Sequence, residues 1–358
     1  MTHSPTTRFN RPLFTVTIWV GFAIFLAALD IHFVSAKVGI NNLFASMQAS
    51  QGVFDGFPHW RIYQSRILGP YLIHGIEHLF GLSPFAAYLV FIASCLFITK
   101  LIVIRFGLRH TDGITPALLM LLSQSLLFAM LLSNSWLYPW DISGLMLSTL
   151  FVVMVLSGTG WPWFLALAAF AFLNRESAIF ICVWLFVQGL LGYGKGTGRK
   201  SPNIGMMAAA AVTALSGLAV TEWLRAHLLI REIGPELWHF TPAGTSWFHW
   251  QLKLNLAGFL SSLTSTSLNL PVIFYAFPLA GLAMAATIGI RCYPAYTALC
   301  LAFSANLICV FLFGILEESR VMIDIIPFFS IFLIYIATST DFCKSCASAR
   351  VDESLKTR

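Results

Sequence analysis

The residues of this chain best suited to chemistry are carboxylates and arginines in short polar turns between apolar runs. The clearest example is Asn174-Arg175-Glu176, which interrupts a long apolar stretch. An arginine guanidinium offers a planar fork to phosphate oxygens, and a carboxylate can accept a proton or bind a cation. A site with both groups suits a lipid-linked phosphate and an acceptor hydroxyl. Other turns carry the same residue types: Asp55, Arg66, Asp141, Glu317 and Arg320.

The apolar runs around these turns indicate which solvent surrounds the protein. Of the 358 residues, 58% are hydrophobic and only 10% are charged, whereas a soluble domain carries roughly 25% charged residues. The mean hydropathy is +0.80. Too little polar surface remains to cover a soluble globule. The apolar runs are about 20 residues long and continuous, which favours helices over alternating barrel strands. The predicted fold class is all-α, a polytopic transmembrane helical bundle.

We expect about ten membrane crossings, each a run of mostly apolar residues. Residues 1–340 would form a single transmembrane domain, and residues 341–358 a short cytoplasmic tail. The expected spans are 13–34, 84–104, 114–133, 142–159, 161–173, 177–193, 204–224, 270–290, 294–315 and 321–340.

The stretch 161–193 decides the predicted topology. It is too long for one ordinary span, and an ion pair at its centre would be costly in hydrocarbon. We therefore expect two short helices that meet at the Asn174-Arg175-Glu176 turn. With Arg8 and Arg11 before the first span, this choice places the basic loops and both termini on the cytoplasmic side. The polar turns then lie on the opposite side, after a first outer loop over about 35–66.

Two segments on that outer side are expected to form short interfacial helices. In residues 67–81, His74, Glu77 and His78 follow helical spacing on one side. The two histidines are four residues apart, a spacing that could ligate a metal, but the interpretation as an interfacial helix is preferred. Residues 254–268 form a second candidate, after a segment rich in tryptophan and histidine.

The net charge of +6 does not indicate a nucleic-acid partner. The basic residues are spread over short loops and form no dense stripe. The polar turns also have a simpler structural interpretation, because Arg175 with Glu176 and Glu318 with Arg320 could be salt bridges that join helix ends. Acids and arginines from five different turns could instead line one outer cavity.

In its layout the chain resembles the C-type (GT-C) superfamily of membrane glycosyltransferases, and more closely the bacterial members of that superfamily. The resemblance rests on three features: a long first outer loop with Asp55 near its end, the Asn174-Arg175-Glu176 turn, and Glu318-x-Arg320 before the last span. It implies a polyprenyl-phosphate-linked sugar as donor, a glycan or lipid as acceptor, and a bacterial inner membrane as location. A divalent cation could assist the phosphate.

The resemblance implies an acidic base in the first outer loop, for which Asp55 is our candidate. Asp30, near the end of the first span, remains an alternative because the adjacent acidic pair common in that superfamily is absent. Asp55 would deprotonate the acceptor hydroxyl. Positive charge near the leaving phosphate would then lower the barrier, and Arg66, Arg175 and Arg320 are the candidates. Glu176, Asp141 and Glu317 would bind sugar hydroxyls or hold those arginines.

Three other functions remain open from the sequence. A polysaccharide polymerase or ligase would place similar side chains outside and also use lipid-linked glycans. A lipid-linked substrate transporter would be expected to show half-repeats and charges at mid-membrane. A membrane scaffold would use the outer charges only as salt bridges.

Overall fold

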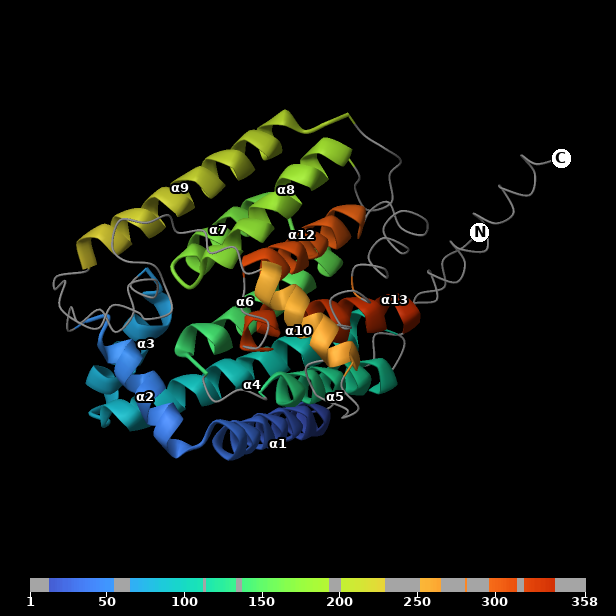
Figure 1. The fold of residues 1–358 in the computed structure, drawn as a ribbon. Helices are drawn as coiled ribbons and strands as arrows, with labels where there is room; N and C mark the ends of the chain where they lie inside the picture. The colour runs from blue at the N-terminus through green and yellow to red at the C-terminus, as the bar shows by residue number, and fades with distance from the viewer. Residues whose placement is uncertain are drawn as a thin grey trace.

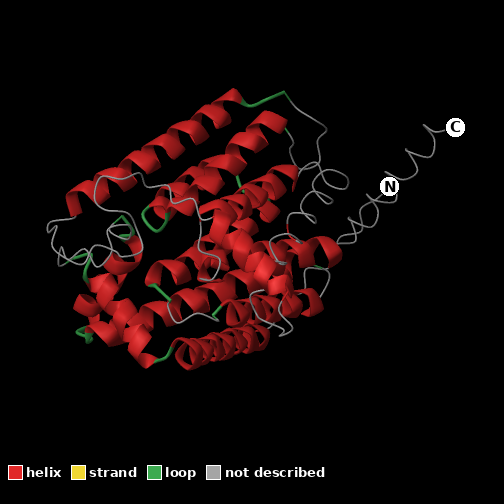
Figure 2. Cartoon of the chain, in the orientation of Figure 1, coloured by secondary structure: helices red, strands yellow, loops and turns green. Residues whose placement is uncertain are grey.

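The computed structural model describes nine stretches of the chain, all of them helix or turn. Figure 2 shows helices joined by short loops, and the described residues contain no strand. The prediction of an all-α fold is therefore confirmed for this part of the chain. The described residues are 13–54, 65–111, 114–132, 137–192, 201–228, 252–264, 281, 296–313 and 319–338.

The helices follow the expected spans closely. Helices or helical turns occupy every predicted range except 270–290, of which only Gly281 lies within the described residues. The elements in chain order are α1 (Leu13–Val38), α2 (Ile40–Gln51), α3 (Leu68–Phe80), α4 (Pro84–His110), α5 (Ile114–Leu131), α6 (Pro139–Ser157), α7 (Trp161–Phe172), η2 (Glu176–Ala178), α8 (Ile179–Leu191), α9 (Ile204–Leu228), α10 (Leu252–Thr264), α12 (Thr297–Phe313), η4 (Ser319–Ile325), η5 (Phe328–Leu333) and α13 (Ile334–Thr338).

Five described helices are long and apolar enough to cross a membrane, which fits an integral membrane protein. They are Val16–Val38, Pro84–His110, Ile114–Leu131, Pro139–Ser157 and Ile204–Leu224. Four shorter apolar helices accompany them in the described part: Trp161–Phe172, Glu176–Leu191, Thr297–Phe313 and Met322–Thr338. The number of about ten crossings, the cytoplasmic location of the termini and the type of membrane stay predictions.

The helices pack side by side in an order that differs from their order in the chain. In Figure 1, α1 and α4 lie along one side, α8 and α9 along the other, and α6 and α12 between them. In α9, 22% of the apolar window is buried, against 61% in α6. The outer helices thus expose apolar faces suited to lipid, and α6 lies at the centre, where it can carry enclosed polar groups.

The expected first outer loop is partly helical, which corrects the sequence interpretation. α1 continues to Val38, and α2 follows after a single residue, Gly39, whose φ is +79°. Glycine adopts this conformation without the steric cost that a Cβ imposes, so the chain can change direction within one residue. Leu43 and Met47, four residues apart, are buried on one face of α2. This face fixes α2 on the bundle.

The other irregular regions agree better with the sequence. The stretch 161–193 forms two short helices, as expected: α7 ends at Phe172, and the helical path restarts with η2 at Glu176. Short helices also occur at α3, within the proposed range 67–81, and at α10, which overlaps the proposed range 254–268 but begins two residues earlier.

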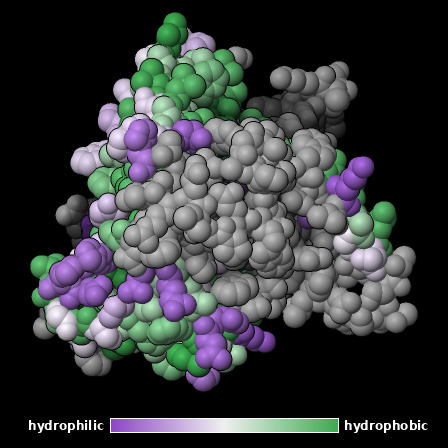
Figure 3. All heavy atoms as spheres, turned by 60° about the vertical axis from the view of Figure 1, so that its left-hand side comes forward, coloured by the Kyte–Doolittle hydropathy of each residue, from purple (hydrophilic) through white to green (hydrophobic). Residues whose placement is uncertain are grey.

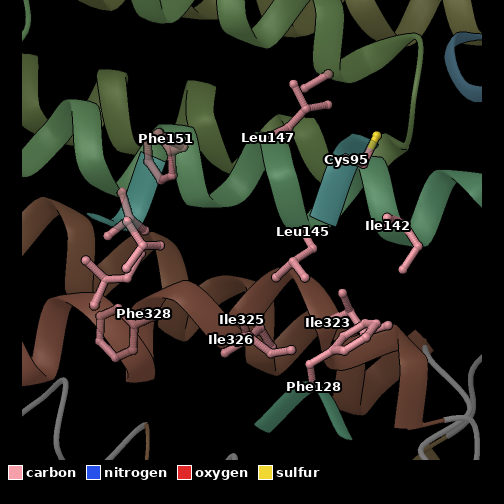
Figure 4. Close-up of a cluster of buried hydrophobic side chains, with 14 of the residues drawn as sticks. Cys95, Phe128, Ile142, Leu145, Leu147, Phe151, Ile323, Ile325, Ile326 and Phe328 are labelled. Carbon is pink, nitrogen blue, oxygen red and sulfur yellow. The ribbon is translucent and has the colours of Figure 1, made fainter. Parts of the chain in front are cut away.

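The last described segment is helical but not a regular α-helix. It runs through the 3-10 helix η4, Pro327 and the π-helical η5 before α13 begins. Proline lacks the backbone N–H of a regular helical bond, and π-helical turns often occur at functional sites. In Figure 4, Ile323 and Ile325 of η4 face Leu145 of α6, with Phe128 of α5 beside them. This packing holds η4 against the start of α6.

Candidate functional site

Five of the polar side chains converge at the end of the bundle where α3 and α6 begin. Arg175 Nη1 lies 3.1 Å from Asp141 Oδ1 and 3.7 Å from Asp324 Oδ2, and Arg66 Nη2 lies 3.2 Å from Glu176 Oε2. We call Arg66, Asp141, Arg175, Glu176 and Asp324 the polar cluster. They come from four separate regions of the chain, so only the tertiary fold brings them together.

The start of α6 explains why Asp141 takes its position. Pro139 occupies the first turn, where a missing N–H costs nothing. The Tyr138 backbone N–H donates to Asp141 Oδ2 over 2.9 Å, which caps the helix start. A negative charge is also favoured there by the helix dipole. Because the cap uses Oδ2, Asp141 can direct Oδ1 toward Arg175.

The turn between α7 and η2 is anchored to both neighbouring elements. The Leu68 backbone N–H donates to the Leu173 carbonyl over 2.9 Å, which joins the start of α3 to the turn. Asn174 Nδ2 donates to the Trp140 carbonyl over 2.9 Å, and Ser143 Oγ donates to Asn174 Oδ1. The three residues of the Asn-Arg-Glu sequence thus have different roles: Asn174 fixes the turn, and the next two residues carry the charges.

Arg175 lies between two carboxylates at the inner part of the cluster. Asp141 and Asp324 have side-chain exposures of 1% and 10%, and that of Arg175 is 13%. Ser177 Oγ donates to Asp324 Oδ2 over 2.8 Å. The other oxygen, Asp324 Oδ1, lies against Gly144, where an added Cβ would be 2.5 Å away. Glycine at position 144 is therefore what allows Asp324 to approach α6.

The Arg66–Glu176 pair forms the more exposed part of the cluster. Its side chains are 11% and 29% exposed. Ser65 Oγ donates to Glu176 Oε1 over 3.4 Å, and the Arg66 guanidinium lies 5.7 Å from the centre of the Trp140 ring. This is within the range of a cation–π contact. Most of the exposure of this pair belongs to Glu176, so water or a ligand reaches this part of the cluster from the side of Glu176.

A pocket extends from the cluster into the helical bundle. Its empty volume is about 510 Å³, its open mouth included. Asn174, Arg175, Ser177, Asn306 and Asp324 supply its polar lining. The rest is mostly apolar, from α6, α7, η2, α8 and α12: Gly144, Leu147, Ser148, Phe151, Ala171, Ala178, Phe180, Ile181, Ala302 and Phe303. Such a lining suits a molecule with a polar head and an apolar body.

The structure locates some of the predicted site residues and not others. Arg66, Asp141, Arg175 and Glu176 lie in the polar cluster as described above. Asp55 and Glu317 lie outside the described residues, as does Glu318. Arg320 belongs to η4, and the structure describes its backbone but not its side chain.

Asp30, the alternative base, belongs to a different polar group. Its Oδ2 lies 2.8 Å from Lys100 Nζ, and neither side chain is exposed. Lys100 Nζ also donates to Ser125 Oγ over 2.8 Å. This enclosed group joins α1, α4 and α5 and leaves no access for an acceptor, so the structure disfavours Asp30 as the base.

Asp324, Ser177, Asn306 and Lys100 were missed as candidates. Asp324 lies only one turn into the last predicted span, so its place beside the Glu-x-Arg motif was a usable signal. Lys100 and Asn306 are isolated polar residues within apolar runs, which is also a signal of an intramembrane task or partner.

The histidines of α3 form a pair on the surface. His74 Nε2 and His78 Nε2 are 3.0 Å apart, and the Phe54 ring stacks on His74 at 4.7 Å. Glu77 Oε2 is 3.8 Å from His74 Nδ1. Across the described stretches, no group of three or more His, Cys, Asp or Glu residues could hold a metal ion.

The surface near the cluster mixes polar and apolar residues. Figure 3 turns the side of the bundle that carries α2 and α3 toward the viewer, and hydrophilic residues (purple) gather there among apolar ones.

No protein-family model, curated protein or solved structure matches the chain. The site's own geometry and chemistry therefore carry the functional argument.

Proposed function

We propose that the protein is a membrane glycosyltransferase that moves a sugar from a polyprenyl-phosphate donor to a glycan or lipid acceptor on the extracytoplasmic side. One observation carries this proposal: carboxylates and arginines from separate turns meet beside a pocket that leads from polar to apolar lining. A lipid that carries a sugar has the same division, with a polar head and a hydrocarbon chain, and in this proposal the phosphate of the donor lies outside the pocket, beside Arg66 and Arg320.

The proposed reaction inverts the anomeric carbon. Asp55 takes the proton of the acceptor hydroxyl, the hydroxyl oxygen attacks the anomeric carbon, and the bond from that carbon to the phosphate oxygen breaks. The polyprenyl phosphate leaves with the electron pair of that bond. Preorganised positive charge stabilises the developing phosphate charge. Arg66, at the edge of the cluster, and Arg320 take this role in the proposal.

Arg175 has a different role in the proposal from that of Arg66. Because it lies between Asp141 and Asp324, its charge is already matched by carboxylates. It would hold those two acids in place, and they would accept hydrogen bonds from sugar hydroxyls. Glu176 would position Arg66 through their 3.2 Å contact, and Glu317 would assist at the mouth of the site.

The experiment is sugar transfer in vitro from a panel of polyprenyl-phosphate sugars to membrane acceptors, with purified protein. Asp55→Asn, Glu176→Gln and Arg320→Gln should each lower product formation by at least about 100-fold, 10-fold and 100-fold, in the range of lost acid–base or electrostatic groups. Asp112→Asn, a charge change expected at the opposite membrane face, is the matched control. No transfer with any donor, from folded protein, would reject the proposal.

A transporter for lipid-linked substrates is the second candidate, favoured by the Asp30–Lys100 pair. Ionisable residues within spanning helices often mark ion or proton pathways. Protein reconstituted in vesicles would then move a lipid-linked sugar across the bilayer without changing it chemically. Movement that stops with Asp30→Asn but continues with Asp55→Asn would favour the transporter over the glycosyltransferase.

A further inference from the structure

The pocket contains a buried polar side chain that the fold does not use. Asn306 lies on α12, lines the pocket and is 7% exposed. Within the described stretches, its amide has no hydrogen-bond partner. The amide atoms keep some accessible surface, so their hydrogen bonds must go to water or to a ligand in the pocket. The position of this amide in the pocket lining suggests that a ligand supplies the missing bonds.

A second polar group of the pocket, the Asp324 carboxylate, could also accept a further hydrogen bond. Asp324 Oδ2 accepts from Ser177, whereas the buried Oδ1 has no hydrogen-bond partner among the described residues. A carboxylate oxygen can only accept, and an amide both donates and accepts. Together, Asp324 and Asn306 match a ligand with several hydroxyl groups, because each hydroxyl can donate to one and accept from the other.

The charge of the polar cluster argues for an uncharged ligand. Two arginines, Arg66 and Arg175, face three carboxylates, Asp141, Glu176 and Asp324, so the ionised set carries one net negative charge. The inner arginine lies between two of those carboxylates. Among the described side chains, an anionic group that entered the pocket would meet Asp324 with no unmatched positive charge beside it. Like charges at close range in a poorly solvated site repel strongly.

The remaining lining favours a ligand with an apolar part. Leu147 and Phe151 of α6, Ile181 of α8 and Phe303 of α12 line the pocket away from the cluster. Burying hydrocarbon against such side chains is favourable, at a rate proportional to the apolar area removed from water. A free sugar would leave this lining unused.

We propose that the pocket binds an uncharged glycolipid, with the Asn306 amide and the Asp324 carboxylate as hydrogen-bond partners of its sugar hydroxyls. The inference rests on the proposed glycosyl transfer and specifies its acceptor: the acceptor is a neutral glycolipid, and its chain lies along the apolar lining. Asn306 and Asp324 are binding groups in this scheme, and the base stays Asp55.

The binding test uses the full chain in lipid nanodiscs and a dodecyl β-glucoside with a diazirine in the alkyl chain. After irradiation, labelled peptides are identified by mass spectrometry. We expect saturable labelling of α6 and α12. Unlabelled dodecyl β-glucoside should compete, whereas dodecyl phosphate and free glucose at the same concentration should not. Equal competition by dodecyl phosphate would overturn the inference, as would labelling that never saturates.

Two variants assign the binding to these groups. Asn306→Leu should weaken labelling by at least about tenfold, because it removes both hydrogen bonds to the ligand. Its thermal stability should be equal or higher, since it replaces a polar side chain in a mostly apolar lining. The matched control is Ser304→Leu, on the same helix but outside the pocket lining. A lower stability with unchanged labelling would assign Asn306 a purely structural role and overturn the inference.

The second variant acts from the opposite wall without changing any charge. In Gly144→Ala, the new Cβ would lie 2.5 Å from Asp324 Oδ1 and should block it. Gly21→Ala is the control, because a Cβ there meets nothing within 4 Å. We expect labelling to fall in Gly144→Ala alone. Normal labelling in both Gly144→Ala and Asn306→Leu would reject the pocket as the site.

The binding assay and the transfer assay can each give a negative result independently, so they distinguish failure of the inference about the acceptor from failure of the proposed function. Labelling that depends on Asn306 in a protein that transfers no sugar would reject the proposed function and leave a glycolipid site. Sugar transfer that proceeds normally in Asn306→Leu, with unchanged KM for the acceptor, would keep the proposed function and overturn the inference about its acceptor.

Discussion

Two groups of charged side chains in the described part of the bundle differ in how completely they are closed. The Asp30–Lys100 pair has no exposed atoms in either side chain, matches one charge with one charge, and gains Ser125 as a further partner. The polar cluster has side-chain exposures of 1% to 29%, holds more carboxylates than arginines, and adjoins a pocket.

This difference separates a structural role from a functional one. A buried charge must be paired because its desolvation is costly, and the closed Asp30–Lys100 pair satisfies that need with no opening for a ligand. Both regions keep a carboxylate oxygen with no hydrogen-bond partner among the described residues, Asp30 Oδ1 and Asp324 Oδ1, but Asp324 lines a pocket and Asp30 does not. The enclosed pair therefore joins α1 to α4, and the cluster is the site at which we propose that a substrate binds.

The largest effect on stability is expected when one member of the Asp30–Lys100 pair is removed and the other charge stays buried without a partner. Lys100→Met should lower the free energy of unfolding by about 3–5 kcal/mol, because it leaves an uncompensated buried carboxylate. Unfolding of the detergent-solubilised protein, followed by circular dichroism, measures the effect. The double variant Asp30→Leu/Lys100→Met should recover most of the loss. A double variant as unstable as Lys100→Met would contradict this explanation.

A smaller effect is expected at the centre of the polar cluster. Arg175→Met leaves Asp141 and Asp324 without their shared partner and should cost about 1–3 kcal/mol, the range for a buried polar group that loses its bond. Water can reach this partly exposed site and limit the loss. Arg175→Lys keeps the charge and should fall between Arg175→Met and the unchanged protein. A cost as large as that of Lys100→Met would remove the distinction between the two regions.

The smallest effect on stability is expected at the edge of the cluster. Glu176→Gln should change the free energy of unfolding by about 1 kcal/mol, at the upper end of the range for surface ion pairs, because Glu176 is the most exposed member of the cluster. The same variant should lower sugar transfer at least about tenfold if Glu176 positions Arg66 for the reaction. Measuring both quantities on one preparation separates the roles. Lost stability with unchanged specific activity would make this pair structural as well.

The sequence predicts much of the fold because span length and hydrophobicity are local properties. The polar turn at Arg175 and Glu176 predicts the break between α7 and α8, since an ion pair in mid-span is costly. The region 35–66 was harder to interpret. Its helix α2 is only weakly hydrophobic on average, and it is held in place by the packing of Leu43 and Met47 against the bundle. No local pattern of strong hydrophobicity marks it.

The residue types at the site and their place at helix ends follow from the sequence alone. Tyr-Pro-Trp-Asp starts a helix and places Asp141 in its first turn, whatever the rest of the chain does. Which charge meets which is a tertiary result: Arg175 joins Asp141 and Asp324 instead of its neighbour Glu176, and Glu176 joins Arg66. Ion pairing depends on a few ångströms of separation, and the packing of η4 and α3 around Gly144 and Pro139 sets those distances.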